Sequence, residues 1–336
     1  MTRVARAIAL SMVTLVGGAS VAGCGAARTV LGIHEAPTAN PALASLTVDH
    51  AERILTRDFT AAQQGEATKG AVAQAALRTA YTGGALRAAN ARVRLASLQP
   101  AGADSHLLTP QQTLLLAVPR GFGFPRVMVA QTVASKGSLP VLHLLTSPDA
   151  MTPYRISASA AMLPSSSVKP FHPFSQGSPL VTDGAGMAVG GDALLKAYAA
   201  GMGFPAKAAK NPPFAPDIFS AQVRAKARSV AKAVATQATF SQVHKVVPSS
   251  VYAVRQAGGG ALVFAVIERT DSFKVKSGQA VNTSDNKEFV LLSGEKRVTR
   301  RASITWLEFV VFSVPGAKGK ATLVAASEQV VAGSGS

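Results

Sequence analysis

A single carboxylate stands inside an otherwise apolar stretch near the C-terminus. In residues 304–310, the alternation of a β-strand puts Trp306 and Glu308 on one face, and apolar side chains dominate both faces. A buried carboxylate needs either a partner or a raised pKa. Two chemistries fit: a pocket acid beside an indole ring, or a structural ion pair with an arginine such as the nearby Arg300 or Arg301. We favour the ion pair.

Two other polar residues interrupt apolar runs in the same manner. Glu268 ends the run 261–267, and His143 lies between Leu142 and Leu144. A lone histidine in a strand is typical of a hydrogen-bonded core residue, and an acid at the end of a strand is typical of a structural ion pair. The alternative is that Glu268 and His143 line a pocket together with Trp306 and Glu308.

The remaining reactive side chains match no known catalytic or metal-binding pattern. None of the six histidines lies in an H-E-x-x-H motif or beside an acid at metal-ligand spacing. The sequence contains no phosphate-binding loop, no dinucleotide fingerprint and no nucleophile elbow. We therefore expect no catalytic residues, no metal site and no cofactor.

The first 24 residues have the layout of an export signal. Arg3 and Arg6 precede a mostly apolar run over 7–16, which is too short for an ordinary transmembrane helix. The order Val21-Ala22-Gly23-Cys24 then resembles the bacterial lipobox, in which the thiol receives diacylglycerol and the chain is cut before the cysteine. Cys24 is the only cysteine. We expect residues 1–23 to be a signal peptide and residues 24–45 a lipidated tether at the outer face of the cytoplasmic membrane; the alternative is a plain signal peptide with an incidental cysteine.

The chain is strongly basic. It carries 34 Lys and Arg against 17 Asp and Glu, a formal charge of +17, and loss of the two arginines in residues 1–23 lowers this to +15. Arg224, Arg228 and Lys232 form one stripe on a predicted helix. The stripe is either a solvated helix face or a surface for anionic lipid headgroups or wall polymers. Nucleic acid is not an expected partner, because aromatic residues are not interleaved with the basic ones.

Along the chain, a helical region is followed by a region of strands, and this order occurs twice. A helix is predicted from residue 46, where Val48, Ala51, Leu55, Phe59 and Ala62 recur three or four residues apart. Asp217 is a favourable N-cap residue, and a second helix is predicted to begin directly after it. Strands are predicted over 113–118, 126–133, 141–146, 155–162, 251–256, 261–270, 288–292, 297–312 and 321–330.

The segment 164–191 is rich in proline, serine and glycine, and we expect a linker there. The predicted fold class is α+β, with two domains in tandem over 46–163 and 192–331. In each domain, N-terminal helices would pack on a curved antiparallel sheet.

Residues 124–166, 217–245 and 300–315 resemble an actinobacterial lipoprotein family whose large domain has no assigned function. The resemblance covers most of the chain and brings no active site with it. It implies halves similar to nuclear-transport-factor-2-like or cystatin-like folds, in which a sheet curls over a pocket.

Three functions remain open at this point. The first is a non-enzymatic envelope lipoprotein that acts as an interaction or assembly module with other envelope components. The second is a carrier of a small apolar ligand, with Trp306 and Glu308 lining its pocket. The third is a cyclase-like or dehydratase-like enzyme, which would need a Glu–His or His–Asp pair facing one cavity.

Overall fold

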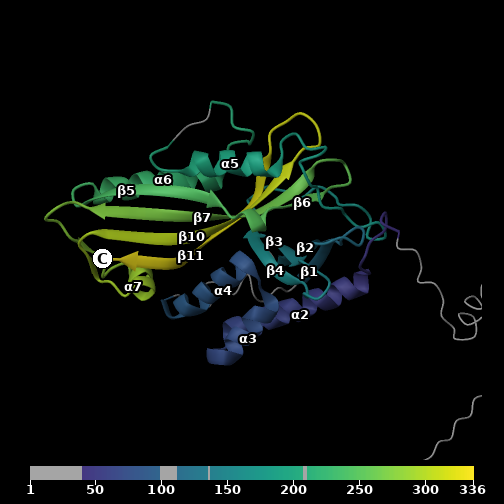
Figure 1. Ribbon diagram of the computed structural model, residues 1–336, viewed down its shortest axis with the longest axis horizontal. Helices are drawn as coiled ribbons and strands as arrows, with labels where there is room; N and C mark the ends of the chain where they lie inside the picture. Colours follow the sequence, from purple (N-terminus) through teal and green to yellow (C-terminus); the bar gives the residue numbers. More distant parts are fainter. Residues whose placement is uncertain (1–39, 99–111, 135–136, 207–209) are drawn as a thin grey trace, which may run out of the picture. The chain divides into compact units, whose positions relative to one another are not determined.

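The computed structural model describes residues 40–98, 112–134, 137–206 and 210–336, and its elements confirm the α+β class (Figure 1). The helices are α2 (Val48–Ala67), α3 (Gly70–Ala80), α4 (Gly83–Leu95), α5 (Gly191–Met202), α6 (Ile218–Val234) and α7 (Lys287–Ser293). The strands are β1 (Gln112–Ala117), β2 (Arg126–Val133), β3 (Val141–Ser147), β4 (Arg155–Ala161), β5 (Ala238–Val246), β6 (Tyr252–Arg255), β7 (Ala261–Val275), β8 (Val281–Asn282), β9 (Arg297–Val298), β10 (Arg301–Val314) and β11 (Thr322–Gly335). Within these described ranges, no helix is both long enough and apolar enough to cross a membrane.

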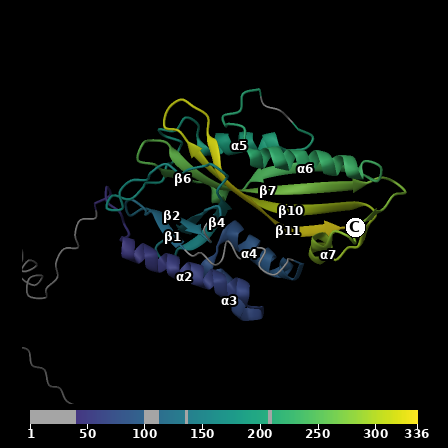
Figure 2. The same cartoon turned by 180° about the vertical axis from the view of Figure 1, so that it is seen from behind.

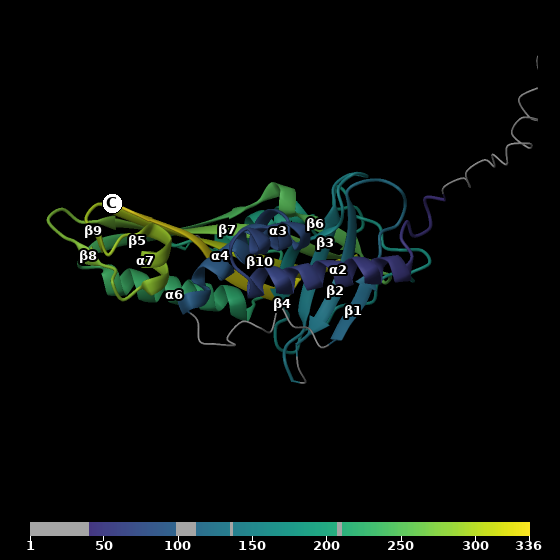
Figure 3. The same ribbon diagram turned by 90° about the horizontal axis from the view of Figure 1, so that it is seen from below.

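The strands form two main antiparallel sheets. One has the order β1-β2-β3-β4, and the other has the order β11-β10-β7-β5, with β6 paired to the first part of β7. Helices α5 and α6 lie along one side of the larger sheet, and α2, α3 and α4 lie on the side of the smaller one (Figures 1 and 2). The view from below shows α2 crossing in front of the smaller sheet (Figure 3).

The central strands of the larger sheet are buried on both faces. On β7, Phe264 and Val266 belong to the core shared with β1–β4, whereas Val263 and Ile267 belong to the core beneath α5 and α6. A strand covered on both faces reads as a continuous apolar run without alternation. This explains why the pattern of β7 and β10 is apolar on both faces and why a charged residue there stands out.

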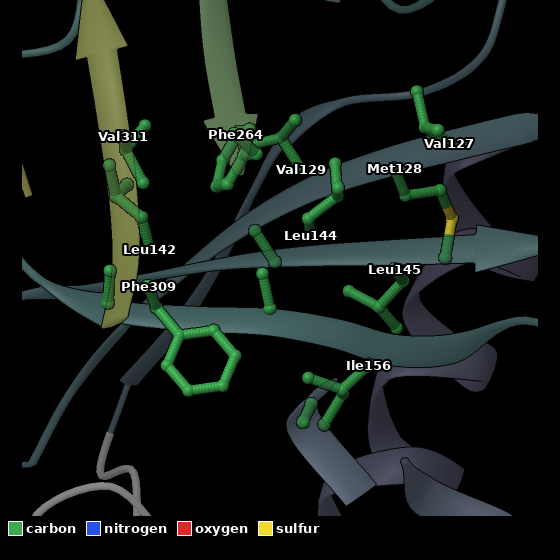
Figure 4. Close-up of a cluster of buried hydrophobic side chains, with 14 of the residues drawn as sticks. Val127, Met128, Val129, Leu142, Leu144, Leu145, Ile156, Phe264, Phe309 and Val311 are labelled. Atoms are coloured by element: carbon green, nitrogen blue, oxygen red, sulfur yellow. The ribbon is translucent and has the colours of Figure 1, made fainter. Parts of the chain in front are cut away.

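The core between the two sheets joins the first and second halves of the chain. Figure 4 shows Leu142 and Leu144 of the smaller sheet near Phe264 and Phe309 of the larger one, and all four belong to one buried cluster. Residues 41–336 accordingly form one compact unit. The halves expected as two domains thus share a hydrophobic core.

The segment 164–191, expected as a linker, lies against both halves. The Ser178 amide donates to the Val118 carbonyl at 2.8 Å, and the Val181 amide donates to the Ala253 carbonyl at 2.8 Å. The serine and proline content of this segment therefore reflects irregular backbone held in place by hydrogen bonds. Ser45, which we expected to lie in a tether, belongs to the compact unit, because its amide donates to the Pro119 carbonyl at 3.1 Å.

Local capping decides two places where a helix begins. Asp217 caps α6 as expected, since its carboxylate accepts from the Ser220 amide at 2.7 Å. The prediction of a strand over 288–292 is wrong, because these residues form α7. Asn286 caps that helix by accepting from the Phe289 amide at 2.9 Å, and Gly294 ends it in the left-handed conformation that glycine favours.

We expect the two halves to unfold together and neither half to fold alone. Chains of residues 41–163 and 192–336 would each expose the apolar face that the other half covers. Circular dichroism during heating should give one cooperative transition for the full chain and no cooperative transition for either half. Two separate transitions in the full chain, or a half that melts cooperatively, would contradict a shared core.

Candidate functional site

Four neighbouring strands bring charged side chains together on the face of the larger sheet that α6 covers. Glu308 lies on β10 opposite Glu328 of β11, and His244 of β5 lies opposite Arg269 of β7. Paired residues in a sheet point to the same face. The side chains of His244, Arg269 and Glu308 are almost completely buried, and we call these three residues with Glu328 the buried charge cluster.

One guanidinium holds the buried charge cluster together. Arg269 Nη1 lies 3.0 Å from Glu308 Oε1 and 2.6 Å from Glu328 Oε2. Its Nε lies 3.4 Å from Asp271 Oδ1 without hydrogen-bond geometry. Arg269 thus faces three carboxylates, which is the compensation that a buried cation requires.

The histidine completes the cluster on its other side. His244 Nδ1 lies 2.9 Å from Glu308 Oε2, and His244 Nε2 lies 2.8 Å from the amide nitrogen of Gln242. That amide nitrogen also donates to the Met202 carbonyl at 3.0 Å, which fixes the orientation of the amide group. The imidazole therefore suits the tautomer that donates from Nδ1 to Glu308 and accepts at Nε2.

Two cations lie near the ring of Trp306. The guanidinium of Arg269 lies 4.5 Å from the ring centroid, and the Lys226 amine lies 4.9 Å from it. Lys226 belongs to α6, and its amine also lies 3.8 Å from Glu328 Oε1. The indole and the lysine stem therefore cover the cluster at the edge where α6 meets the sheet.

The electrostatics of the cluster follow from burial. Burial raises the pKa of Asp271, and the Arg269 guanidinium opposes that rise. Burial alone would lower the pKa of Arg269, but the carboxylates of Asp271, Glu328 and Glu308 together raise it. The guanidinium keeps its charge, which fits a permanent ion pair.

Glu308 has the ion pair that we expected, although with a different arginine. Its partner is Arg269, 39 residues away in the chain, and neither Arg300 nor Arg301. The Glu308–His244 pair has the groups that acid–base chemistry needs, yet both side chains are 0% exposed. A substrate has no access to a pair sealed in this way, so the arrangement is suited to holding strands and helix together.

The other pocket candidates lie elsewhere. Glu268 points away from α6 and forms a 2.9 Å ion pair with Arg87, and both side chains are partly exposed. His143 lies in the smaller sheet, 2.9 Å from the Thr132 hydroxyl and 2.9 Å from the Ser159 hydroxyl. The structure therefore does not bring Glu268 or His143 together with Trp306 and Glu308.

His143 is set up as a core residue. Burial lowers the pKa of His143 to about 3, so the ring is neutral at physiological pH. Its ring packs edge-on against Phe59, with centroids 4.9 Å apart. It lines a cavity of about 50 Å³, which has room for a few water molecules and is far smaller than a typical small-molecule site.

Sequence reasoning missed a second buried acid. Asp58 of α2 is 0% exposed and forms a 2.7 Å ion pair with Arg57. Burial raises the pKa of Asp58 to about 7, against the opposing effect of Arg57. The sequence does contain a sign of this burial, because Asp58 lies on the same predicted helix face as the apolar residues Leu55 and Ala62.

The remaining predicted residues divide into two groups. Arg224, Arg228 and Lys232 all lie on α6, with Arg228 and Lys232 exposed and Arg224 half-buried. Cys24 and the preceding Val21, Ala22 and Gly23 lie outside the described residues.

We predict that Glu308→Gln destabilises the fold while Glu268→Gln does not. The first change removes a charge-assisted bond and leaves Arg269 with one buried carboxylate fewer, at a cost on the order of 1–3 kcal/mol. The second change breaks a partly exposed pair and should cost about 0–1 kcal/mol. Urea denaturation measures both free energies of unfolding, and equal losses in the two variants would refute the structural role of Glu308.

The compact unit as a whole matches a family of known protein domains. No curated protein and no solved structure matches the chain, and the likeness of its halves to nuclear-transport-factor-2-like or cystatin-like folds stays a prediction. A family of domains of unknown function, DUF8094, matches residues 42–335. That range is nearly the same as the compact unit of residues 41–336. The chain therefore belongs to the DUF8094 family, a large domain of unknown function.

Proposed function

We propose that the protein is a lipid-anchored lipoprotein of the actinobacterial cell envelope, whose folded unit binds other envelope components without catalysing a reaction. The observation that carries the proposal is the position of Cys24. It is the only cysteine, and it follows the order of basic start, apolar run and small residues that lipidation requires. The thiol sulfur would attack the glycerol carbon of a membrane phospholipid, so that a C–S thioether forms while the C–O bond to the phosphate headgroup breaks; the headgroup leaves as a phosphate ester and the thiol loses its proton. Water would then hydrolyse the peptide bond before Cys24.

A diacyl anchor holds the chain at the outer face of the membrane. Each buried methylene contributes about 0.8 kcal/mol, so two acyl chains give stable attachment where a single chain is marginal. Residues 25–39 then connect the anchor to the compact unit that begins at Pro41. The basic balance of the chain and the stripe of Arg224, Arg228 and Lys232 suit a surface of anionic headgroups or wall polymers.

The non-catalytic part of the proposal rests on the buried charge cluster. Glu308, His244 and Arg269 satisfy one another beneath α6. An enzyme of the cyclase or dehydratase kind would need such a pair to face a substrate. In this structure the charged groups of the cluster instead pair with one another and stabilise the fold.

A second candidate, a carrier of a small apolar molecule, is favoured by one observation. A cavity of about 240 Å³ lies between α6, β7, β10 and α7, lined by apolar side chains that include Val234, Phe273, Phe289 and Ile304. It is lined neither by Trp306 nor by Glu308, so the ligand site would lie closer to α7 than the sequence suggested.

Lipidation predicts that Cys24→Ser releases the protein from the membrane fraction. Mass spectrometry of the membrane-bound parent should find Cys24 as the first residue, carrying diacylglycerol on its sulfur. Ser11→Ala, a change of similar size within the apolar run, should leave the protein in the membrane fraction. A free thiol at Cys24, or a cut at another position, would rule out the anchor.

A further inference from the structure

A pocket of about 400 Å³ opens where the first turn of α4 meets the ends of β3 and β4 and the segment 247–252. This is within the size range of small-molecule sites. The wall is fixed by backbone hydrogen bonds, since the Thr82 amide donates to the Ile156 carbonyl at 2.9 Å. The pocket thus lies between parts of the chain that are far apart in sequence, and Figure 1 shows α4 beside β4.

The charge of the pocket is positive. Arg87 and Arg155 line it, and its lining contains no acidic residue. Arg87 is already paired with Glu268 at 2.9 Å. Arg155 forms no ion pair or hydrogen bond with any residue in the described ranges, and its Nε is fully buried. Arg155 interacts electrostatically with Asp58 of α2, which does not line the pocket.

A hydroxyl without a partner lies beside this arginine. Thr146 lines the pocket and is 5% exposed, and its hydroxyl forms no hydrogen bond within the described part of the chain. The buried polar atom without a partner is Arg155 Nε, and such an atom is uncommon in a folded protein and points to a missing water or ligand. Thr146 and Arg155 are opposite each other on β3 and β4, so the hydroxyl and the guanidinium come from neighbouring positions.

The start of α4 supplies further donors at the same place. Gly83 and Gly84 line the pocket, and the N-cap residue Thr82 makes no side-chain hydrogen bond to the helix. The first amides of a helix have no partner within it, and they carry partial positive charge. A guanidinium, a hydroxyl and helix amides are together the donors that phosphate groups bind.

We propose that this pocket binds the phosphate group of a small organic phosphate. The phosphate oxygens would accept from Arg155, Thr146 and the first amides of α4. The apolar body would lie on the apolar side of the pocket, which includes Pro148, Pro153 and Val247. The site does not depend on lipid anchoring, so either proposal stands if the other fails.

Titration of the full chain tests the site, with inorganic phosphate, phenyl phosphate and dihexanoyl phosphatidic acid as probes. Calorimetry measures the affinity, and the amide resonances of Gly83 and Gly84 report binding at α4. We expect saturable binding of a phosphate probe below roughly 10 mM that shifts both resonances. Tighter binding of phosphatidic acid than of inorganic phosphate would identify a lipid headgroup as the source, and equal binding would identify free phosphate.

Two variants in the pocket and one control test which residues bind the phosphate. Arg155→Gln should weaken phosphate binding about tenfold or more, and Thr146→Val should weaken it by a few fold, as expected for lost hydrogen bonds to a charged ligand. Arg297→Gln removes an exposed arginine of β9, away from the pocket, and should leave the affinity unchanged. If no phosphate probe binds, or if Arg155→Gln and Arg297→Gln weaken binding equally, the proposal is wrong. Thermal melting confirms that each variant is folded.

Discussion

The fold depends on accommodating the charge of Arg269 inside the larger sheet. The side chain is 2% exposed, and a cation so placed has lost nearly all of its hydration. Hydrogen bonds from Nη1 to Glu308 and Glu328 replace part of that hydration, and the carboxylate of Asp271 lies 3.4 Å from Nε. Because these residues come from β7, β10 and β11, the guanidinium constrains the register of the strands that form the middle of the sheet.

The same constraint explains the arrangement of α6. Its apolar side chains Phe219 and Val223 pack in the core on the sheet and Ala227 is buried, while Lys226 reaches Glu328 and the ring of Trp306. The helix therefore closes over both an apolar region and a charged one. Every polar group in a buried cluster needs a partner, and a cluster with most of its partners in place favours one packing over its alternatives.

The two cores on either face of β7 and β10 make the remainder of the fold interdependent. Leu307 and Phe309 pack toward the smaller sheet, whereas Val310 and Phe312 pack toward α5 and α6. A strand between two cores transmits a packing change from one side to the other. The sheet is thus the common support for the pocket near α4 and the buried charge cluster under α6.

Local patterns predicted the elements whose faces are regular. The spacing of apolar residues located α2 and α6, and apolar runs located β2, β3, β7 and β10. The sequence pattern did not predict strand β5, because the polar residues Gln242 and His244 occupy two of its buried positions. Apolar and polar residues therefore do not alternate along it. Helix α7 was read as a strand because its short apolar run lacks a helical period, and the capping by Asn286 decided its conformation.

The candidate site was predictable only in part, for a physical reason. Burial of Glu308 followed from its neighbours, but its partners Arg269 and His244 come from strands whose pairing is a property of the whole sheet. Likewise, the shared core that unites the two halves depends on long-range packing of two sheets, which periodicity within either half does not encode. The pocket at α4 is built from segments far apart in the chain, including parts of β7 and β10, and has no sequence motif.

A double-mutant cycle between Arg269 and Glu308 tests the central claim most directly. Denaturant unfolding of Arg269→Met, Glu308→Leu and the double variant gives the coupling free energy between the two side chains. Each single change should cost on the order of 3–5 kcal/mol because it leaves a buried charge without its partner. We expect the double variant to lose less than the sum of the two, with a coupling of about 1–3 kcal/mol. Strictly additive losses would contradict the account, because they would mean that the two charges do not depend on each other.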